Sequence, residues 1–171
     1  IAKAPGSSPK PPEGACSCCT IACLASEPGH LLVLYRTAHD NQRQRDVYLL
    51  SSWDHGKSCS SLKIDAWTSN CCVASGHALA GAPSGSYAAW ETLGQVFFSK
   101  ATFSGKDAPK VSEPVSAPGV GRTRVWPQMA PGVGGALLLA WTEGPRWQPG
   151  DSVAWKTYDA EGMPVNAPGM A

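Results

Sequence analysis

Short runs of alternating apolar and polar-facing positions recur along this chain and predict β-strands. In one such run, Val47 and Leu49 fall on one side of an extended chain while Tyr48 and Leu50 fall on the other, which is the two-residue period of a strand. The longest apolar run, Ala136–Trp141, has the length of a strand. Long helical periodicity is absent, so the pattern predicts an all-β protein.

A unit of three such strands occurs three times. Each copy has an apolar segment, a turn containing glycine and proline, a strand ending in an aromatic and a polar residue, and a third alternating strand. The predicted strands are 20–25, 31–36 and 46–51 in the first copy, 77–80, 87–91 and 95–99 in the second, and 126–130, 136–142 and 152–157 in the third. A fourth strand is expected after each third strand, at 61–67, at 111–115 and from Met163 onward.

The aromatic residues at the end of each second strand give the period of the repeat. Tyr35, Trp90 and Trp141 are separated by 55 and 51 residues, near the roughly 40–50 residues of a propeller blade. Each copy therefore predicts one four-stranded antiparallel blade, and the three aromatics are expected to pack between blades. The expected blade boundaries are near 16–70, 71–121 and 122–171, with innermost strands near 20–26, 76–81 and 125–130.

Composition supports this fold class and argues against two kinds of partner. Pro (15) and Gly (18) are frequent among the 171 residues, which suits short strands joined by many turns. The 14 basic residues nearly balance the 13 acidic ones, and no basic stripe indicates nucleic-acid binding. No apolar run approaches the ~20 residues that a membrane-spanning helix needs. Residues 1–15 are rich in Pro, Gly and Ser and are predicted to form a linker or tail.

The cysteines indicate both a compartment and a site. They are Cys16, Cys18, Cys19, Cys23, Cys59, Cys71 and Cys72. Such density favours an extracytoplasmic location, periplasmic or secreted, with any signal peptide removed or outside this sequence. The odd count leaves at least one thiol without an intrachain disulfide. Cys23, in mid-strand, and Cys59 are expected to be small buried hydrophobes.

The turn after the third strand of the first copy resembles the Asp-box (BNR) hairpin of sialidase-like β-propellers. The pattern of that hairpin is Ser-x-Asp-x-Gly-x-Ser/Thr-aromatic, and Ser52, Asp54, Gly56 and Ser58 match it, while Cys59 stands at the aromatic position. The resemblance implies that these residues stabilise a turn far from any active site. Because sialidase-like propellers have six blades, it also implies that the three copies form half of a six-bladed propeller.

The wider string CSCC…LLVLYR…RDVYLLSSWDHGKS…CCVASGHALA is similar to a group of bacterial secreted sialidase-like proteins. They carry Cys-x-Cys-Cys before blade one and a second cysteine segment, commonly Cys-Pro-His-Ser-Gly-Pro, before the next. The similarity covers residues 16 to about 164. Here Val73 and Ala74 stand at the Pro and His positions, and the nearby imidazole is that of His77.

Two interpretations of the clustered cysteines stay open. By the register of the repeats, Cys16, Cys18, Cys19, Cys71 and Cys72 lie where the chain enters the first two innermost strands, at one mouth of the channel. A disulfide from Cys18 or Cys19 to Cys71 or Cys72 would close a loop of about 50 residues and contribute on the order of 4 kcal/mol. The other interpretation is a copper or zinc site, with His77 as a further ligand.

The resemblance also implies where sialidase chemistry would lie. Sialidases hold the substrate carboxylate with an arginine cluster and use a Tyr–Glu pair as nucleophile. The candidate ligand-binding arginines are Arg36, Arg122 and Arg124, whereas Thr20 occupies the position of the arginine in the Arg-Ile-Pro motif. The candidate pair would combine Tyr35, Tyr87 or Tyr158 with Glu91 or Glu143, and the spacing selects none of them.

These observations favour a non-enzymatic function. We expect an extracytoplasmic binding or interaction module whose ligand site is the cysteine-lined mouth, together with His77 and Arg124. The alternatives are a glycoside hydrolase of exo-sialidase type and a structural subunit of a larger assembly. A glycan or a small molecule is the candidate ligand, and a second copy or a partner chain is expected to close the propeller.

Overall fold

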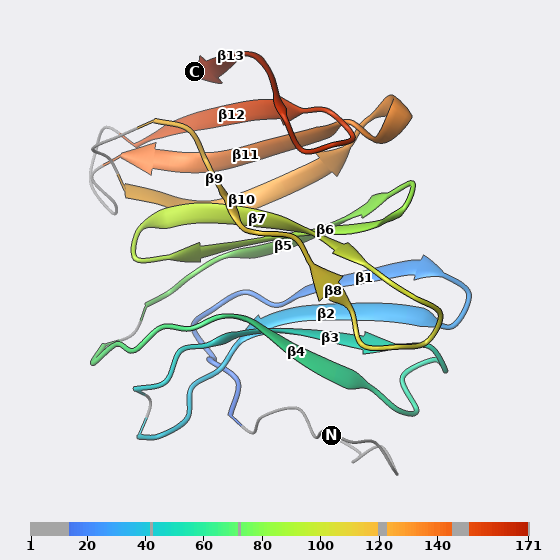
Figure 1. Cartoon of the computed structure of the whole chain (residues 1–171). Coiled ribbons are helices and arrows are strands. Elements are labelled where there is room, and N and C mark those ends of the chain that lie inside the picture. The colour runs from blue at the N-terminus through green and yellow to red at the C-terminus, as the bar shows by residue number, and fades with distance from the viewer. Residues whose placement is uncertain (1–13, 42, 72, 120–122, 145–150, 171) are drawn as a thin grey trace.

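The strands of the computed structural model form three antiparallel sheets that follow one another along the chain (Figure 1). The structure describes residues 14–41, 43–71, 73–119, 123–144 and 151–170, with side chains up to residue 165. The first sheet contains β1 (Ala22–Glu27), β2 (His30–Arg36), β3 (Val47–Ser52) and β4 (Ser60–Asp65). The third contains β10 (Thr123–Pro131), β11 (Leu137–Gly144), β12 (Ser152–Tyr158) and β13 (Pro164–Met170). The prediction of an all-β protein with three four-stranded antiparallel sheets is confirmed.

The second sheet differs from the prediction at its outer edge. Its first three strands are β5 (His77–Ala82), β6 (Gly85–Thr92) and β7 (Gln95–Thr102), and the fourth position is shared by β8 (Lys110–Val111) and β9 (Val115–Ser116), which both pair with β7. The prediction of a single outer strand at 111–115 is therefore wrong. Pro114 lies between the two short strands and has no N–H to donate to β7.

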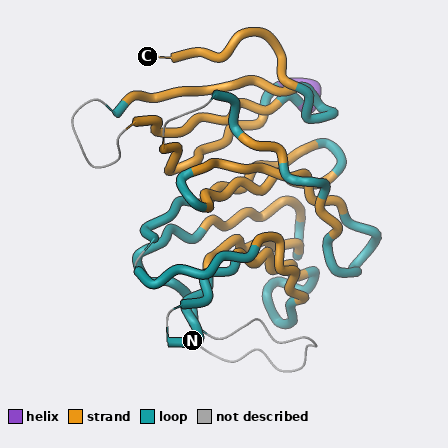
Figure 2. The backbone as a smooth tube through the Cα atoms, turned by 60° about the vertical axis from the view of Figure 1, so that its left-hand side comes forward, coloured by secondary structure: helices purple, strands orange, loops and turns teal. Residues whose placement is uncertain are grey.

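The first strands of the three sheets adjoin, β1 beside β5 and β5 beside β10 (Figures 1 and 2). Just before β1 and β5, the backbone N–H of Thr20 donates to the carbonyl of Ser75 at 3.1 Å. Between β5 and β10 the approach is so close that a Cβ on Gly76 would lie 2.8 Å from the Cα of Trp126. Glycine is required at this position because any side chain would push the two strands apart.

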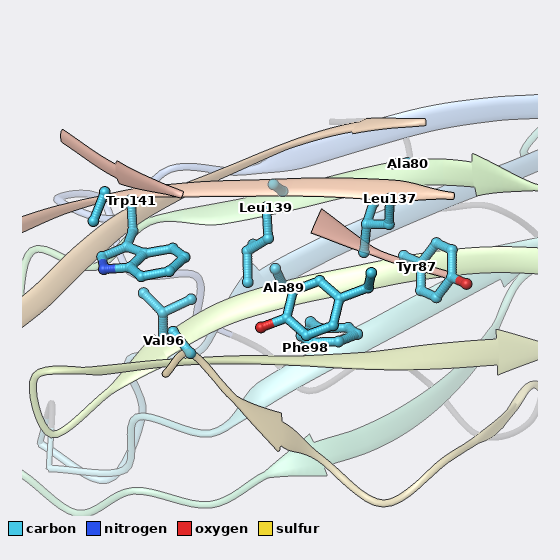
Figure 3. Packing of buried hydrophobic residues seen from close by; sticks show 12 residues of the cluster. Ala80, Tyr87, Ala89, Val96, Phe98, Leu137, Leu139 and Trp141 are labelled. Atoms are coloured by element: carbon cyan, nitrogen blue, oxygen red, sulfur yellow. The ribbon is translucent and has the colours of Figure 1, made fainter. Parts of the chain in front are cut away.

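Two apolar clusters hold the three sheets together. Leu32, Leu34, Val47 and Leu49 of the first sheet pack against Ala88, Trp90 and Ala101 of the second. The second cluster joins Tyr87, Ala89, Val96 and Phe98 of the second sheet to Leu137, Leu139, Trp141 and Tyr158 of the third (Figure 3). Each fully buried aliphatic or aromatic side chain contributes about 1.5–3 kcal/mol. The middle sheet is thus covered on both faces.

The two aromatics Trp90 and Trp141 lie between sheets, as predicted, and each faces the preceding sheet. Tyr35 is also buried, but the first sheet has no preceding sheet within the described chain, and its ring lies beside Tyr48 on the opposite face from Leu34. The first and third sheets therefore each have one face that no described sheet covers. On the third sheet this face includes Leu138 and Val153, which are 40% and 55% exposed.

Within the described residues the single helical segment is a 3₁₀ turn, Val133–Gly135. Accordingly, no helix of the described chain has the length and hydropathy to cross a membrane.

Candidate functional site

Three cysteine sulfurs converge just before β1. The Sγ atoms of Cys16, Cys18 and Cys19 all lie within 4.8 Å of one another, and we call these three residues the cysteine cluster. The Sγ of Cys16 lies 3.3 Å from that of Cys18 and 2.8 Å from that of Cys19. A tight turn produces this arrangement, because the N–H of Cys19 donates to the carbonyl of Cys16 at 3.3 Å. The sequence prediction that these three residues form one site is consistent with this geometry.

The members of the cluster differ in exposure and oxidation state. Cys18 is exposed and disulfide-bonded, Cys16 is a buried free thiol, and Cys19 is a half-buried free thiol. Burial and the hydrogen bond with Cys16 raise the pKa of the Cys19 thiol. Cys71 is an exposed free thiol bonded locally to Ser69, so of the two predicted alternatives, Cys71 and Cys72, it is not the one that forms a disulfide. Cys72 lies outside the described residues.

The segment before β5 holds the cluster in place. Both the N–H and the hydroxyl of Ser75 lie 3.5 Å from the Sγ of Cys19 and donate to it. The hydroxyl of Thr20 accepts from the N–H of His77 at 2.8 Å. These contacts explain how the cysteine-bearing segment of the first sheet meets the start of the second, as the repeat register predicts.

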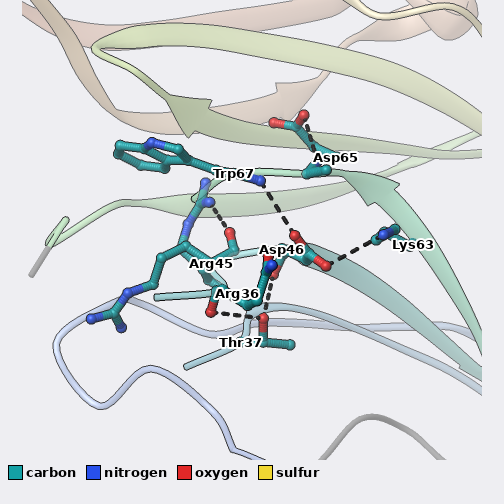
Figure 4. Close-up of polar contacts among 9 residues, drawn as sticks. Arg36, Thr37, Arg45, Asp46, Lys63, Asp65 and Trp67 are labelled. Atoms are coloured by element: carbon teal, nitrogen blue, oxygen red, sulfur yellow. Dashed lines mark hydrogen bonds and ion pairs between the residues drawn. The ribbon is translucent and has the colours of Figure 1, made fainter. Parts of the chain in front are cut away.

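Two buried arginines lie beside the cluster. The Nη1 of Arg45 donates to the Sγ of Cys16 at 3.4 Å, and its Nε has no hydrogen-bond partner within the described chain. Arg36 donates from Nε to the hydroxyl of Ser75 at 2.7 Å and from its Nη atoms to the carbonyls of Arg45 and Glu91. Arg36 also lies against the ring of Trp67, 4.9 Å from its centroid (Figure 4). The guanidinium of Arg36 is therefore engaged by protein groups, and its geometry favours a role in holding the first and second sheets together.

His77 is buried near the start of β5 but is not part of the group of converging sulfurs. Its Nδ1 donates to the carbonyl of Thr20 at 2.7 Å, which leaves Nε2 as an unprotonated acceptor without a hydrogen-bond partner in the described structure. Burial, with a contribution from the charge of Arg36, lowers the pKa of His77 to about 4. The ring is therefore neutral at pH 7.

The predicted arginine cluster is not assembled from the residues that the structure describes. Arg124 is buried and pairs with a carboxylate of the same sheet, its Nε lying 3.1 Å from Oε2 of Glu143. The same Oε2 accepts from the indole N–H of Trp141 at 3.0 Å. Arg122 lies outside the described residues. Since Arg36 and Arg124 have separate protein partners, the described geometry gives no paired cradle for a carboxylate.

The candidate Tyr–Glu pair has no support in the described contacts. The hydroxyl of Tyr87 donates to the carbonyl of Ala160 at 3.2 Å, and Glu143 is occupied by Arg124 and Trp141. Burial raises the pKa values of Tyr35 and Tyr158 to about 12. A higher pKa makes the phenolate harder to form, which is opposite to what a nucleophile needs.

The turn that resembles an Asp box, Ser52–Ser58, links β3 and β4 at the other end of the first sheet, and we call it the Asp-box turn. The Ser52 hydroxyl accepts from the N–H of Gly56 at 2.8 Å, and Asp54 accepts from the N–H and hydroxyl of Ser58 at 2.8 and 2.6 Å. These bonds, led by the Ser58 hydroxyl, lower the pKa of Asp54 to about 2. The contacts are local, as expected for a structural turn.

The two cysteines predicted to be buried are not. Cys23 is exposed because, in β1, it alternates with Ala22 and Leu24, which pack toward the second sheet. Cys59 is half-buried. The sequence prediction missed that β1 has one uncovered face.

A cavity lies away from the cysteines, at the Asp-box end of the first sheet. A volume of about 670 Å³ opens between the first two sheets near the Asp-box turn, lined by residues that include His30, Trp53, Phe103 and Lys106. The rings of His30 and Trp53 stack there at 3.6 Å. Because Ser26 and Ser51 bond the two nitrogens of His30, these aromatics form a packed wall.

The sequence prediction missed two features of the candidate site. The first is Arg45, which no spacing rule connects to Cys16, 29 residues earlier. The second is the Cys-x-x-Cys spacing of Cys16 and Cys19, which is present in the sequence but is easily overlooked because Cys18 lies between them.

Comparisons with protein-family models, with curated proteins and with solved structures each find no match.

Proposed function

We propose that this chain is an extracytoplasmic binding module, built as half of a sialidase-like β-propeller, whose ligand is a soft metal cation held by the cysteine cluster. The observation that carries the proposal is the convergence of three sulfurs within 4.8 Å of one another. Three donors on one four-residue segment are unusual for packing alone, since a buried structural cysteine needs no sulfur neighbour.

The donor set defines the class of ligand. Thiolates select soft cations such as Cu(I), and also bind Zn(II). An ion at about 2.3 Å from each sulfur holds tetrahedral sulfur ligands about 3.8 Å apart, compared with 3.3 and 2.8 Å here. The Cys16–Cys18 and Cys16–Cys19 sulfur pairs must therefore separate by about 0.5 and about 1 Å, and Cys18 must be reduced before all three can bind. Cu(I) fits best because it accepts three sulfur ligands without a fourth.

The neighbours of the cluster suit an anionic sulfur site. The guanidinium of Arg45 and the two donors of Ser75 point at sulfur atoms. Positive charge and hydrogen bonds offset the negative charge of thiolates in a partly buried site. A disulfide at Cys18 is in keeping with an extracytoplasmic location.

The uncovered faces of the first and third sheets support the propeller part of the proposal. The uncovered face of the third sheet carries apolar side chains of the kind that the middle sheet buries, such as Leu138 and Val153. A second copy or another chain segment that packs on these faces would continue the row of adjoining first strands. The exo-sialidase alternative has less support, because Arg36 and Arg124 have separate protein partners and Glu143 pairs with Arg124 and Trp141.

A metal titration tests the function. The chain is fully reduced without oxygen, freed of reductant and titrated with Cu(I) against a chromophoric Cu(I) chelator. We expect one tightly held Cu(I) per chain, with affinity at least tenfold lower in Cys16→Ser and Cys19→Ser. Cys23→Ser is the matched control, since that thiol is exposed and outside the cluster. The proposal would be overturned if wild type and Cys16→Ser retained Cu(I) equally, or if wild type retained no Cu(I).

A further inference from the structure

We propose that Cys16 and Cys19 form a redox-active dithiol that exchanges with the disulfide of Cys18. This inference concerns the same cysteine cluster as the proposed function and rests on that function only in this respect. The exchange itself requires no metal. The sequence offers the spacing, Cys16-x-x-Cys19, which is that of many exchanging dithiols. The structure offers a third, oxidised sulfur within reach of both.

The separations of the sulfur atoms favour exchange. The free thiols of Cys16 and Cys19 lie 2.8 Å apart, and a disulfide bond needs about 2.05 Å. The movement required is therefore under about 1 Å. The Sγ of Cys18 lies 3.3 Å from that of Cys16, close enough for a thiolate to approach it. Cys16 thus stands next to both of its prospective partners.

The surroundings divide the roles of the two thiols. The cationic Nη1 of Arg45 donates to the Sγ of Cys16 at 3.4 Å, so a positive charge lies beside the sulfur that neighbours both other cysteines. The thiolate is the form that attacks a disulfide. Cys19 accepts from the N–H and the hydroxyl of Ser75, and its Sγ lies 2.8 Å from that of Cys16, so it can attack Cys16 in turn. Cys18 is exposed, so an external thiol or disulfide can reach it.

The exchange balances without an added oxidant. The Cys16 thiolate attacks the Sγ of Cys18, a Cys16–Cys18 bond forms, and the sulfur previously bonded to Cys18 leaves as a thiolate. The Cys19 thiolate then attacks the Sγ of Cys16, which forms Cys16–Cys19 and releases Cys18. Two electrons pass from the dithiol to the original disulfide, and the two protons lost by Cys16 and Cys19 are taken up by the two released sulfurs. The class of external substrate is a thiol or disulfide that reacts at Cys18.

Trapping the disulfides at controlled redox potential tests this inference. The folded full chain is equilibrated in glutathione buffers with strong chelators, quenched with acid, alkylated and mapped by mass spectrometry. We expect Cys16–Cys19 to be populated in wild type over a range of potentials. In Cys19→Ser the second step is blocked, so Cys16–Cys18 should accumulate instead. Cys23→Ser should match wild type.

A second variant guards against misfolding of the cysteine mutants. Arg45→Gln removes the charge beside Cys16 and keeps all seven cysteines, and we expect the exchange rate to fall about tenfold or more. Cys16 and Cys19 remaining free at every potential would overturn the inference, as would an unchanged rate in Arg45→Gln. Either failure is separate from failure of the metal site, which is measured on fully reduced protein.

Discussion

The two ends of the first sheet use polar residues in opposite ways. In the Asp-box turn, the hydroxyls of Ser52 and Ser58 and the carboxylate of Asp54 bond to groups no more than four residues away. At the cysteine end, the contacts join residues far apart in sequence, such as Arg45 with Cys16 and Ser75 with Cys19. Buried atoms there also lack hydrogen-bond partners within the described chain, namely Nε of Arg45 and Nε2 of His77.

This contrast separates a structural site from a candidate functional one. A turn whose polar groups satisfy one another has no remaining capacity for a ligand. Buried donors and acceptors without partners carry a free-energy cost, and they are retained where they serve a ligand or a reaction. The cysteine end therefore combines converging sulfur atoms with unused bonding capacity, whereas the Asp-box end has unused capacity at the buried indole N–H of Trp53 but lies away from the converging sulfurs.

The largest expected effect comes from the arginine that supports the cysteine end. Arg36→Met removes the donors that serve Ser75 and the carbonyls of Arg45 and Glu91 and leaves those buried acceptors unpaired. We expect the free energy of unfolding to fall by roughly 3–5 kcal/mol, measured by urea denaturation. Arg43 is exposed, so the control variant Arg43→Met should change the free energy of unfolding by less than about 0.5 kcal/mol. Comparable losses in both variants would contradict the structural role of Arg36.

The next effect is a pH dependence from His77. Its pKa is about 4 in the folded chain, against 6.5 ordinarily, so below pH 6.5 the unfolded chain binds a proton that the folded chain does not. Stability should therefore fall as the pH drops from 6.5 to about 4, by at most roughly 3 kcal/mol.

The contribution of His77 is isolated by measuring the free energy of unfolding across this pH range and comparing its slope between variants. In His77→Asn the side-chain amide retains a donor for the Thr20 carbonyl but does not titrate, so the slope should become shallower. The matched control is His55→Asn, because His55 is exposed and has a φ of 60°, which Asn tolerates. A slope equally altered in both variants would contradict the assignment to His77.

The smallest effect belongs to the Asp-box turn and lies at lower pH. Because the folded pKa of Asp54 is about 2 and its ordinary value is 3.8, its stabilising contribution is present above pH 3.8 and is lost as the pH falls toward 2. Asp54→Asn should flatten stability over that window, whereas Asp107→Asn, at an exposed carboxylate, should not. Asp54→Asn should leave the rate at which Cys16 is alkylated unchanged, because the Asp-box turn lies at the opposite end of the first sheet. A change in that rate would contradict the conclusion that the two ends act independently.

Much of the fold follows from local sequence, because strand periodicity and turn residues are local signals. The third strand of each sheet was expected at 46–51, 95–99 and 152–157 and is found at Val47–Ser52, Gln95–Thr102 and Ser152–Tyr158. The errors arise where tertiary packing decides. Cys23 is exposed because no described sheet covers that face of β1, and the outer edge of the second sheet is divided at Pro114.

The candidate site was predictable only in part, for the same reason. Cys16, Cys18 and Cys19 are neighbours in sequence, so their convergence could be expected. Arg45 reaches the cluster from the segment before β3, and Ser75 reaches it from the segment before β5; neither long-range contact gives a sequence signal. His77 was expected to join the cluster because it follows the second cysteine segment, but its Nδ1 is directed to the Thr20 carbonyl instead.

X-ray absorption spectroscopy of the Cu(I)-loaded chain tests most directly whether the three cysteines act as one site. The account predicts a single shell of three sulfur ligands in wild type and in Cys23→Ser, and two sulfurs in Cys18→Ser. A shell dominated by nitrogen or oxygen, or a sulfur count that Cys18→Ser leaves unchanged, would contradict it.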